Sequence, residues 1–215
     1  MVVIKRILLF MIGVTLFSCQ PKIDLKSDKH LTEIFTDNEL KEIEKMISYV
    51  DDRVVEQTGN KDINEAYHQL LDKMDRSINA VGFFVPFEEE EKYQFFESLD
   101  STLFNDIWYI GNHLRYTKYK DSIYHNLDNY KYLGLRISGK YVDYLEKIGE
   151  DDKNICFFKE DIKLAGGISP AVVARFLYNR KDFDFNIPKH RLWAAVFILS
   201  MEEPHDKKME RYLKD

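Results

Sequence analysis

The six histidines are the residues whose side chains could most directly carry acid–base or metal chemistry. In His125-Asn126-Leu127-Asp128, one helical turn would place an imidazole beside a carboxylate, the arrangement of a general base and its orienting group. A solvent-exposed contact between neighbouring turns of a helix is the alternative, and we favour it because such pairs are common on helix surfaces. No two histidines stand three or four residues apart and no His-Glu-x-x-His occurs, so the sequence predicts neither a zinc site nor a catalytic residue.

Other signatures of catalysis are also missing from the sequence. It holds no Gly-x-Ser-x-Gly elbow and no Ser-x-x-Lys with its companion motifs. The acidic run 88–91 suits the first turn of a helix better than a calcium loop, whose Asp/Gly pattern is absent. Gly166-Gly167 indicates a turn rather than an anion cradle, because no Lys-Ser/Thr signature follows it. We expect no metal and no cofactor, while a carboxylate pair for glycoside hydrolysis stays open because its members need only meet in space.

The chain has two cysteines, Cys19 and Cys156. Ile155, Phe157 and Phe158 surround the second one, so we predict that Cys156 is a small buried hydrophobic residue rather than a nucleophile. An intramolecular disulfide would have to join these two residues, so it cannot form in a chain in which Cys19 is modified.

The chain around Cys19 has the order of an export signal. Two basic residues precede an apolar run of about 11 residues that ends in Leu16-Phe17-Ser18-Cys19. These four residues resemble the lipobox of bacterial lipoproteins, in which an apolar residue and then a small residue precede an obligatory cysteine. The resemblance implies that the preceding peptide is removed and that Cys19 carries diacylglycerol. An uncleaved anchor helix is the alternative, but the run is short of the roughly 20 residues that span a bilayer.

The residues after Cys19 bear on the location that this resemblance implies. In bacterial lipoproteins an Asp directly after the cysteine retains the protein in the inner membrane, whereas Gln20 stands here, which favours the outer membrane. Surface-exported lipoproteins of the Bacteroidetes carry acidic clusters at this point, and residues 20–24 hold none, which favours the periplasmic face. We therefore expect a signal peptide over 1–18, a lipidated cysteine and polar tether over 19–29, and a domain over 30–215.

The composition excludes some classes of partner. Without Lys5 and Arg6, the mature chain of about 197 residues has 29 basic and 37 acidic residues, a net charge of −8. Basic and acidic residues are interspersed and no basic block occurs, which argues against nucleic acid and anionic lipid as partners. A chain of this length can bury a sizeable core without disulfides.

A tyrosine-rich segment is the candidate binding region. Eight of the thirteen tyrosines lie between Tyr109 and Tyr144, and basic residues alternate with them. Tyrosine combines a rigid ring with a hydroxyl and is favoured in contacts with proteins and sugars. The predicted binding residues are Tyr116, Tyr119, Tyr124, Tyr130, Lys118 and Lys120. Amphipathic tyrosines that cover a helical core are the alternative.

Helical periods dominate the first part of the mature chain. Thr36 and Glu39 form a capping box before apolar residues at helical spacing, and Gly59 ends that helix. A second helix is predicted over 62–80, and the two would form an antiparallel hairpin. An apolar loop follows over 82–87. We then expect a helix from the acidic run 88–91, with a helical continuation over 102–116.

The second part also shows helical patterns. Residues from Tyr130 to Ile148 keep helical spacing, and 155–164 fits a short helix or a strand. Ser169 and the proline after it open a helix over 171–178. The most apolar mature segment, 188–199, predicts the central core helix, with a charged tail after Pro204. Because no segment alternates with period two, we predict an all-α fold, a bundle or orthogonal array of about 7–9 helices.

These observations favour one function class. The lipobox, the missing catalytic signatures and the tyrosine-rich segment together favour a lipid-anchored envelope protein that binds a protein partner. An immunity-type inhibitor is one concrete version. The competing hypothesis is an enzyme or binding protein that acts on glycan or cell-wall substrates, and a third is a structural accessory of an envelope complex.

Overall fold

A computed structural model describes residues 22–78 and 83–214 of the chain. Cys19, the lipobox and the signal peptide 1–18 lie outside the described residues, as do the first residues of the predicted tether. Within the described part, no helix has the length and apolar character needed to cross a membrane.

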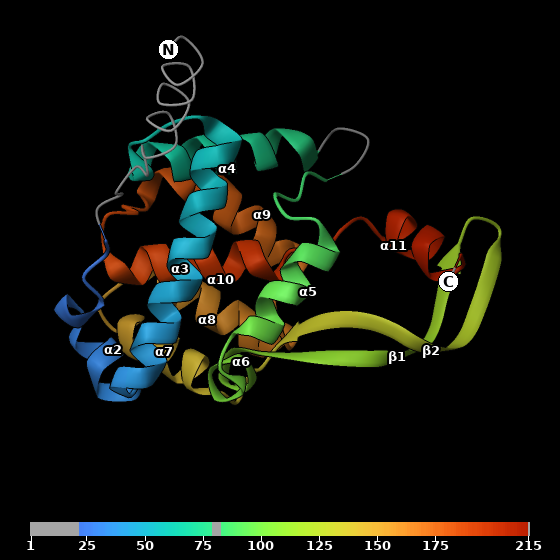
Figure 1. The fold of residues 1–215 in the computed structure, drawn as a ribbon, viewed down its shortest axis with the longest axis horizontal. Coiled ribbons are helices and arrows are strands. Elements are labelled where there is room, and N and C mark those ends of the chain that lie inside the picture. The colour runs from blue at the N-terminus through green and yellow to red at the C-terminus, as the bar shows by residue number, and fades with distance from the viewer. Residues whose placement is uncertain (1–21, 79–82, 215) are drawn as a thin grey trace, which may run out of the picture.

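The described residues form a helical body from which a two-stranded sheet projects (Figure 1). The helices of the first half are η2 (Leu25–Ser27), α2 (Lys29–Ile34), α3 (Asp37–Thr58), α4 (Ile63–Ile78), α5 (Glu89–Ser98) and α6 (Ser101–Ile107). The sheet consists of β1 (Trp108–Tyr119) and β2 (Ser122–Leu135). The remaining helices are α7 (Lys140–Ile148), α8 (Lys153–Ala165), α9 (Pro170–Asn179), η3 (Arg180–Asp182), α10 (Pro188–Ser200) and α11 (His205–Tyr212).

The first helical pair confirms the prediction from capping and periodicity. The Thr36 side chain accepts from Glu39 N, and the Glu39 carboxylate accepts from Thr36 N, so both halves of the capping box are present. Gly59 ends α3 with φ 70°, a left-handed conformation that glycine adopts without strain. The apolar stripes of α3 and α4 face inward, and both helices pack against the core.

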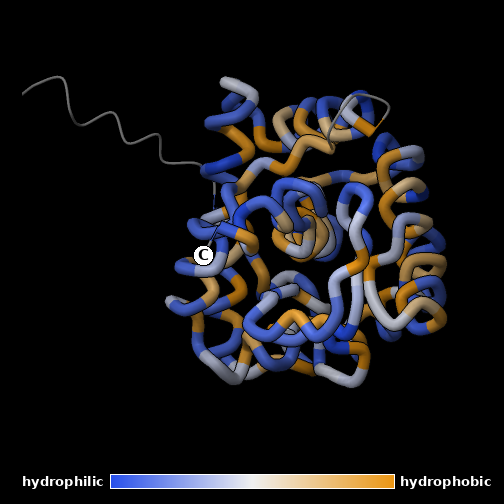
Figure 2. The backbone as a smooth tube through the Cα atoms, turned by 90° about the vertical axis from the view of Figure 1, so that its right-hand side faces the viewer, coloured by the Kyte–Doolittle hydropathy of each residue, from blue (hydrophilic) through white to orange (hydrophobic). Residues whose placement is uncertain are grey.

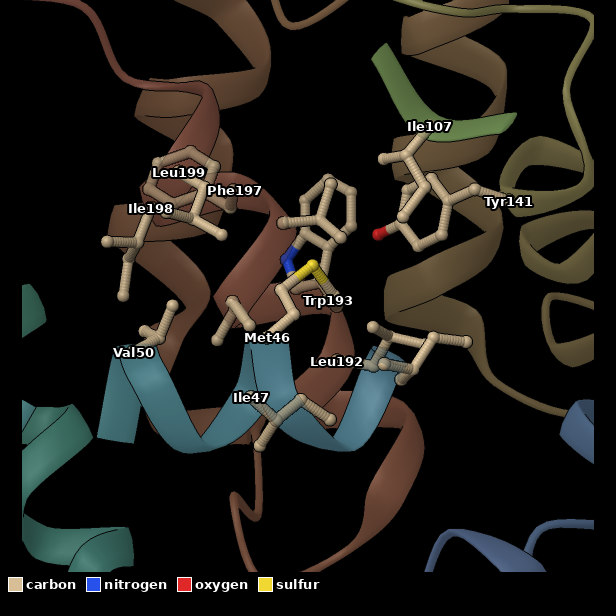
Figure 3. Packing of buried hydrophobic residues seen from close by; sticks show 14 of the residues in the cluster. Met46, Ile47, Val50, Ile107, Tyr141, Leu192, Trp193, Phe197, Ile198 and Leu199 are labelled. Atoms are coloured by element: carbon tan, nitrogen blue, oxygen red, sulfur yellow. The ribbon is translucent and has the colours of Figure 1, made fainter. Parts of the chain in front are cut away.

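The central core helix is α10, as its sequence predicts. Every residue from His190 to Leu199 is buried. Figure 1 shows α10 crossing the middle of the helical body, and Figure 2, which looks along it, shows hydrophobic residues gathered around this axis. In Figure 3, Met46 and Val50 of α3 lie against Trp193 and its neighbours on α10. Such a helix has no polar face because other elements cover it all round.

The middle of the chain contradicts the all-α prediction. Helix α6 ends at Ile107, and the residues expected to continue as helix instead form the antiparallel hairpin of β1 and β2. Helix returns only at Lys140, so the helical spacing from Tyr130 onward predicts α7 correctly but not the strand before it. The described residues are thus predominantly helical rather than purely helical.

A physical feature of the hairpin explains this error. A β-bulge interrupts the register between Gly111 and His113, and Asn126 and Asn129 have positive φ angles of 52° and 63°. Each irregularity shifts the alternation of side chains between the two faces of a strand. Tyr124, Leu127 and Tyr130 therefore turn to one side at intervals of three residues, which imitates a helical period.

The chain after α10 also differs from the prediction. A charged tail was expected beyond Pro204, but α11 forms there and packs on the hairpin. The ambiguous segment 155–164 is helical, within α8, and Asp152 caps its first turn. Ser169 caps α9 and Pro170 takes its first helical position, as predicted.

Candidate functional site

The hairpin of β1 and β2, called the arm below, leaves the helical body and bends near its middle (Figure 1). Beyond the bulge, Tyr116 pairs with His125 and Lys118 with Ile123, while Thr117 pairs with Tyr124. Residues directly opposite each other share a face of the sheet, and successive residues alternate between faces. The outer half of the arm therefore has two distinct faces.

Two tyrosine–glycine pairs keep the base of the arm tightly packed. Tyr109 pairs with Gly134 and Tyr132 with Gly111 across the strands. Each ring lies over the opposite glycine, so closely that an added Cβ would come within 2.2 Å of Tyr109 Cζ or 2.1 Å of Tyr132 Cζ. A larger residue at either glycine would therefore force the opposite ring to move.

The inner face of the arm consists of Tyr119, Tyr124 and Tyr130 with Leu114 and Leu127, and α11 covers it. Tyr119 and Tyr130 are buried there, and they form a small hydrophobic cluster with Leu127 and Met209 of α11. This cluster is separate from the core of the helical body.

The outer face of the arm consists of Tyr116, Lys118, Ile123 and His125. Tyr116 is 66% exposed and Ile123 is 63% exposed, and the two residues belong to neighbouring cross-strand pairs. Two exposed apolar side chains flanked by basic ones have the character of a contact surface for a protein, because single exposed hydrophobic residues are common but adjacent ones are less so.

The structure divides the predicted binding residues between these surfaces. It brings Tyr119, Tyr124 and Tyr130 together on the inner face, but it places Tyr116 and Lys118 on the outer face. Lys120 lies in the turn, 3.8 Å from Glu210 Oε1 and 4.7 Å from the centre of the Tyr119 ring. The binding role of these residues stays a prediction. Sequence reasoning missed Ile123, because its exposure follows from a strand that was not predicted.

The contact between His125 and Asp128 that the sequence analysis considered, as a general base or, preferably, as an exposed contact on a helix, does not form. His125 and Asp128 lie on a strand rather than a helix, and His125 faces Tyr116 across the sheet. Asp128 instead contacts His113, with 2.9 Å between Nδ1 and Oδ1, on an exposed surface. Both interpretations required one helical turn between His125 and Asp128, so both are wrong.

A cluster of charged residues joins α5, the segment before α11, and α11. We call Glu89, Glu202, Glu203, Lys208 and Arg211 the ionic cluster. Glu89 and Lys208 are buried, and Lys208 Nζ lies 3.0 Å from Glu89 Oε1. Arg211 contacts Glu89 at 3.0 Å and Glu203 at 2.5 Å. More than a hundred residues separate Glu89 from its partners, and no local motif could have revealed this arrangement.

Glu202 connects the ionic cluster to the arm. Its Oε1 atom accepts from Lys208 Nζ at 2.6 Å and from the backbone N–H of Leu133 on β2 at 2.9 Å. Lys207 pairs with Glu88 and Glu203 at the rim of the cluster. The arm, α11 and α5 thus share one set of charges.

The environment of the ionic cluster shifts several pKa values. Burial raises the pKa of Glu89, but the hydrogen bond with Glu203 and the charges of Lys208 and Arg211 outweigh burial and lower the pKa to about 2. Burial and the adjacent Glu89 raise the pKa of Glu203. Burial lowers the pKa of Lys92 to about 8. The Nζ atom of Lys92 donates to the Met201 carbonyl at 2.6 Å.

The proximity of Glu89 and Glu203 superficially resembles a catalytic carboxylate pair. Their side chains are 2% and 4% exposed and are engaged by Lys208 and Arg211. A substrate cannot reach two carboxylates enclosed in this way, so the pair supports a structural role.

Two further buried polar groups fix α10. The Asp51 carboxylate accepts from Arg191 at 2.8 and 3.1 Å and from the Tyr67 hydroxyl at 2.9 Å. His190 Nδ1 accepts from the Asp184 N–H and its Nε2 donates to Asp152, each at 2.9 Å. Both nitrogens of His190 are occupied, so it has none to offer a substrate.

The remaining candidates are placed as follows. Cys156 was predicted to be buried, but it is half-buried on α8 with Sγ 4.0 Å from Glu160 Oε1, because it lies beside rather than on the helix face that carries Ile155 and Phe158. Across residues 22–78 and 83–214, no group of three His, Cys, Asp or Glu side chains is arranged to hold a metal ion.

Comparisons with protein families, with curated proteins and with solved structures give no match to this chain.

Proposed function

We propose that this protein is a lipid-anchored protein of the cell envelope, attached through Cys19 to the outer membrane and facing the periplasm, and that its arm binds a protein partner. The observation that carries the binding proposal is the outer face, where Tyr116 and Ile123 are both exposed and lie diagonally across the two strands, Tyr116 opposite His125 and Ile123 opposite Lys118. The lipobox residues support the anchor.

The way the arm is held supports this role. An isolated two-stranded hairpin is marginally stable in water. Here α11 packs on the inner face, and Glu202 fixes the base of the arm. A hairpin held in one orientation can present a surface to a partner with little entropic cost on binding.

Site-specific photo-crosslinking in cells tests the proposal. A photoreactive residue at Tyr116 or Ile123 should crosslink to one dominant envelope protein. The matched controls are Tyr178 and Leu164, which are 84% and 87% exposed on the helical body and should give no dominant product. Equal crosslinking from all four positions would contradict the arm as the binding element.

Substitution provides a second readout of the same surface. The double variant Tyr116→Ser/Ile123→Ser should lose the crosslinked partner in a co-purification assay, whereas Tyr178→Ser/Leu164→Ser should retain it. Since all four side chains are exposed, both variants should unfold at the parental temperature. The anchor is tested separately with Cys19→Ser, which should abolish incorporation of labelled palmitate.

A further inference from the structure

Helix α11 is attached to the arm by few apolar contacts. Met209 is its one fully buried apolar side chain, and Tyr212 is partly buried with its ring centre 5.4 Å from that of Tyr130. The other residues of His205–Tyr212 are polar or charged. An isolated helix of this length is not stable in water, so α11 depends on its tertiary contacts.

Polar contacts between α11 and the arm supply the rest of the attachment. The Tyr119 hydroxyl donates to Glu210 at 3.0 Å, and the Tyr212 hydroxyl donates to the Asp128 carbonyl at 2.8 Å. His205 Nε2 donates to the Lys118 carbonyl at 3.1 Å. Each such bond contributes about 1 kcal/mol net, because water can replace either partner when the helix detaches.

The ionic cluster is what ties α11 to the helical body. Glu89 of α5 contacts both Lys208 and Arg211, and no hydrophobic residue of α11 belongs to the body core. Removal of one partner from a buried set of charges leaves the others uncompensated, which is costly. The attachment of α11 to the helical body therefore depends on a few charged side chains.

We propose that α11 is a releasable cover over a helix-binding surface, and that the inner face of the arm accepts an amphipathic helix of a partner protein when α11 detaches. This deepens the proposed function and rests on it for the partner. The occupant is identified by what α11 itself shows: the inner face receives a helix with one long apolar side chain at Met209 and an acidic side chain at Glu210.

Replacement of α11 by a partner helix is favourable because the inner face of the arm is more apolar than α11, which covers it. Tyr119, Tyr124, Tyr130 and Leu127 offer aromatic and aliphatic surface, whereas α11 brings one fully buried apolar residue to it. A partner helix with apolar residues at successive turns would bury more of this surface than α11 does. It would bind tightly only after α11 detaches, since a covered site lowers the apparent affinity.

Hydrogen exchange of the purified full chain tests the release of α11. Amides of α11 should exchange at least about tenfold faster than those of α10, because α11 opens locally and α10 opens with the whole core. In the Glu89→Gln variant, the amides of α11 should exchange at least about tenfold faster than in the parent chain, whereas the exchange rates of the α10 amides should be unchanged. Glu88→Gln is the matched control, because Glu88 is 77% exposed and pairs with Lys207 at the rim.

Binding of a synthetic α11 peptide, residues 203–214, tests the surface. The full-chain variant Met209→Asp should keep its helical body and bind the fluorescent peptide at least about tenfold more tightly than the parent chain. A peptide that itself carries Met209→Asp should not bind. Near-native circular dichroism of the protein variant would show that the body has folded.

Three results would overturn the proposal. The first is equal exchange in α11 and α10, and the second is failure of the folded Met209→Asp chain to bind the peptide. The third is a stable dimer of that variant that excludes the peptide, which would identify a second copy of the chain as the occupant. None of these requires the unknown partner, so they are distinct from failure of the crosslinking experiment on the outer face.

Discussion

The helical body and the arm are stabilised by different kinds of contacts. In the body, a continuous hydrophobic core surrounds α10, and Trp193 stacks on Phe158 with 4.6 Å between ring centres. Between the arm and α11, only four buried residues form the hydrophobic cluster, three from the arm and Met209 from α11, and hydrogen bonds and the ionic cluster complete the attachment. Apolar burial grows with the size of a core, so the body should unfold as a unit while the arm and α11 open separately.

Replacement of one large ring should separate the two regions most strongly. Trp193→Ala removes a fully buried side chain and should lower the free energy of unfolding by about 3–5 kcal/mol. Tyr130→Ala should have less than half this effect on global unfolding and should accelerate hydrogen exchange in the arm and α11. Urea unfolding followed by far-ultraviolet circular dichroism measures both variants, and equal losses would contradict the comparison.

A buried ion pair in the body provides the next largest effect. Arg191→Met leaves the Asp51 carboxylate without its cation, and burial, the main cause, already raises the pKa of Asp51. The loss should be about 3 kcal/mol in urea unfolding. Asp51→Leu/Arg191→Met should recover part of this loss, because the double variant buries no unpaired charge. If the double variant loses the sum of the two single effects, the two side chains are not coupled.

The same contrast explains how far the sequence could predict the structure. In the body, local signals agree with the fold: the Thr36 capping box, the apolar stripe of α3 and the unbroken apolar run of α10 each determine an element. In the arm, the local sequence signals do not agree with the fold. Positive φ angles at Asn126 and Asn129 and the bulge beside Gly111 depend on tertiary context, and they give strand residues a spacing close to that of a helix.

The candidate site was predictable in its region but not in its arrangement. The tyrosine-rich segment largely coincides with the arm, since Tyr116, Tyr119 and Tyr130 all lie on it, and its binding role stays a prediction. The face on which each residue lies depends on the strand register, and a shift of the register by one residue moves every side chain to the opposite face. The ionic cluster could not be predicted, because Glu89 meets Lys208 only when α5 and α11 are brought together by the fold.

Acid should weaken the attachment of α11 through Glu89. The folded-state pKa of Glu89 is about 2, below its ordinary value of 4.5, so its ionised form stabilises the fold above about pH 4.5. This contribution is lost as the pH falls from about 4.5 through 2. The free energy of opening α11 should therefore differ by about 2 kcal/mol between parent and Glu89→Gln at pH 7, and the two values should converge near pH 2. Hydrogen exchange of the α11 amides across this range measures the difference, and a constant gap between the two proteins would contradict the assignment.

The smallest expected effect concerns the base of the arm, where the arm meets the helical body. Gly134→Ala places a Cβ where the ring of Tyr109 lies, and the ring must move because its Cζ would be 2.2 Å away. Since Tyr109 is 36% exposed, its ring can rotate into solvent, and the loss should be about 1 kcal/mol rather than the larger cost of overpacking a closed core. Tyr109→Ala/Gly134→Ala removes the clash, so its stability should equal that of Tyr109→Ala alone within about 0.5 kcal/mol. A loss above about 3 kcal/mol from Gly134→Ala would mean that the arm base belongs energetically to the body core.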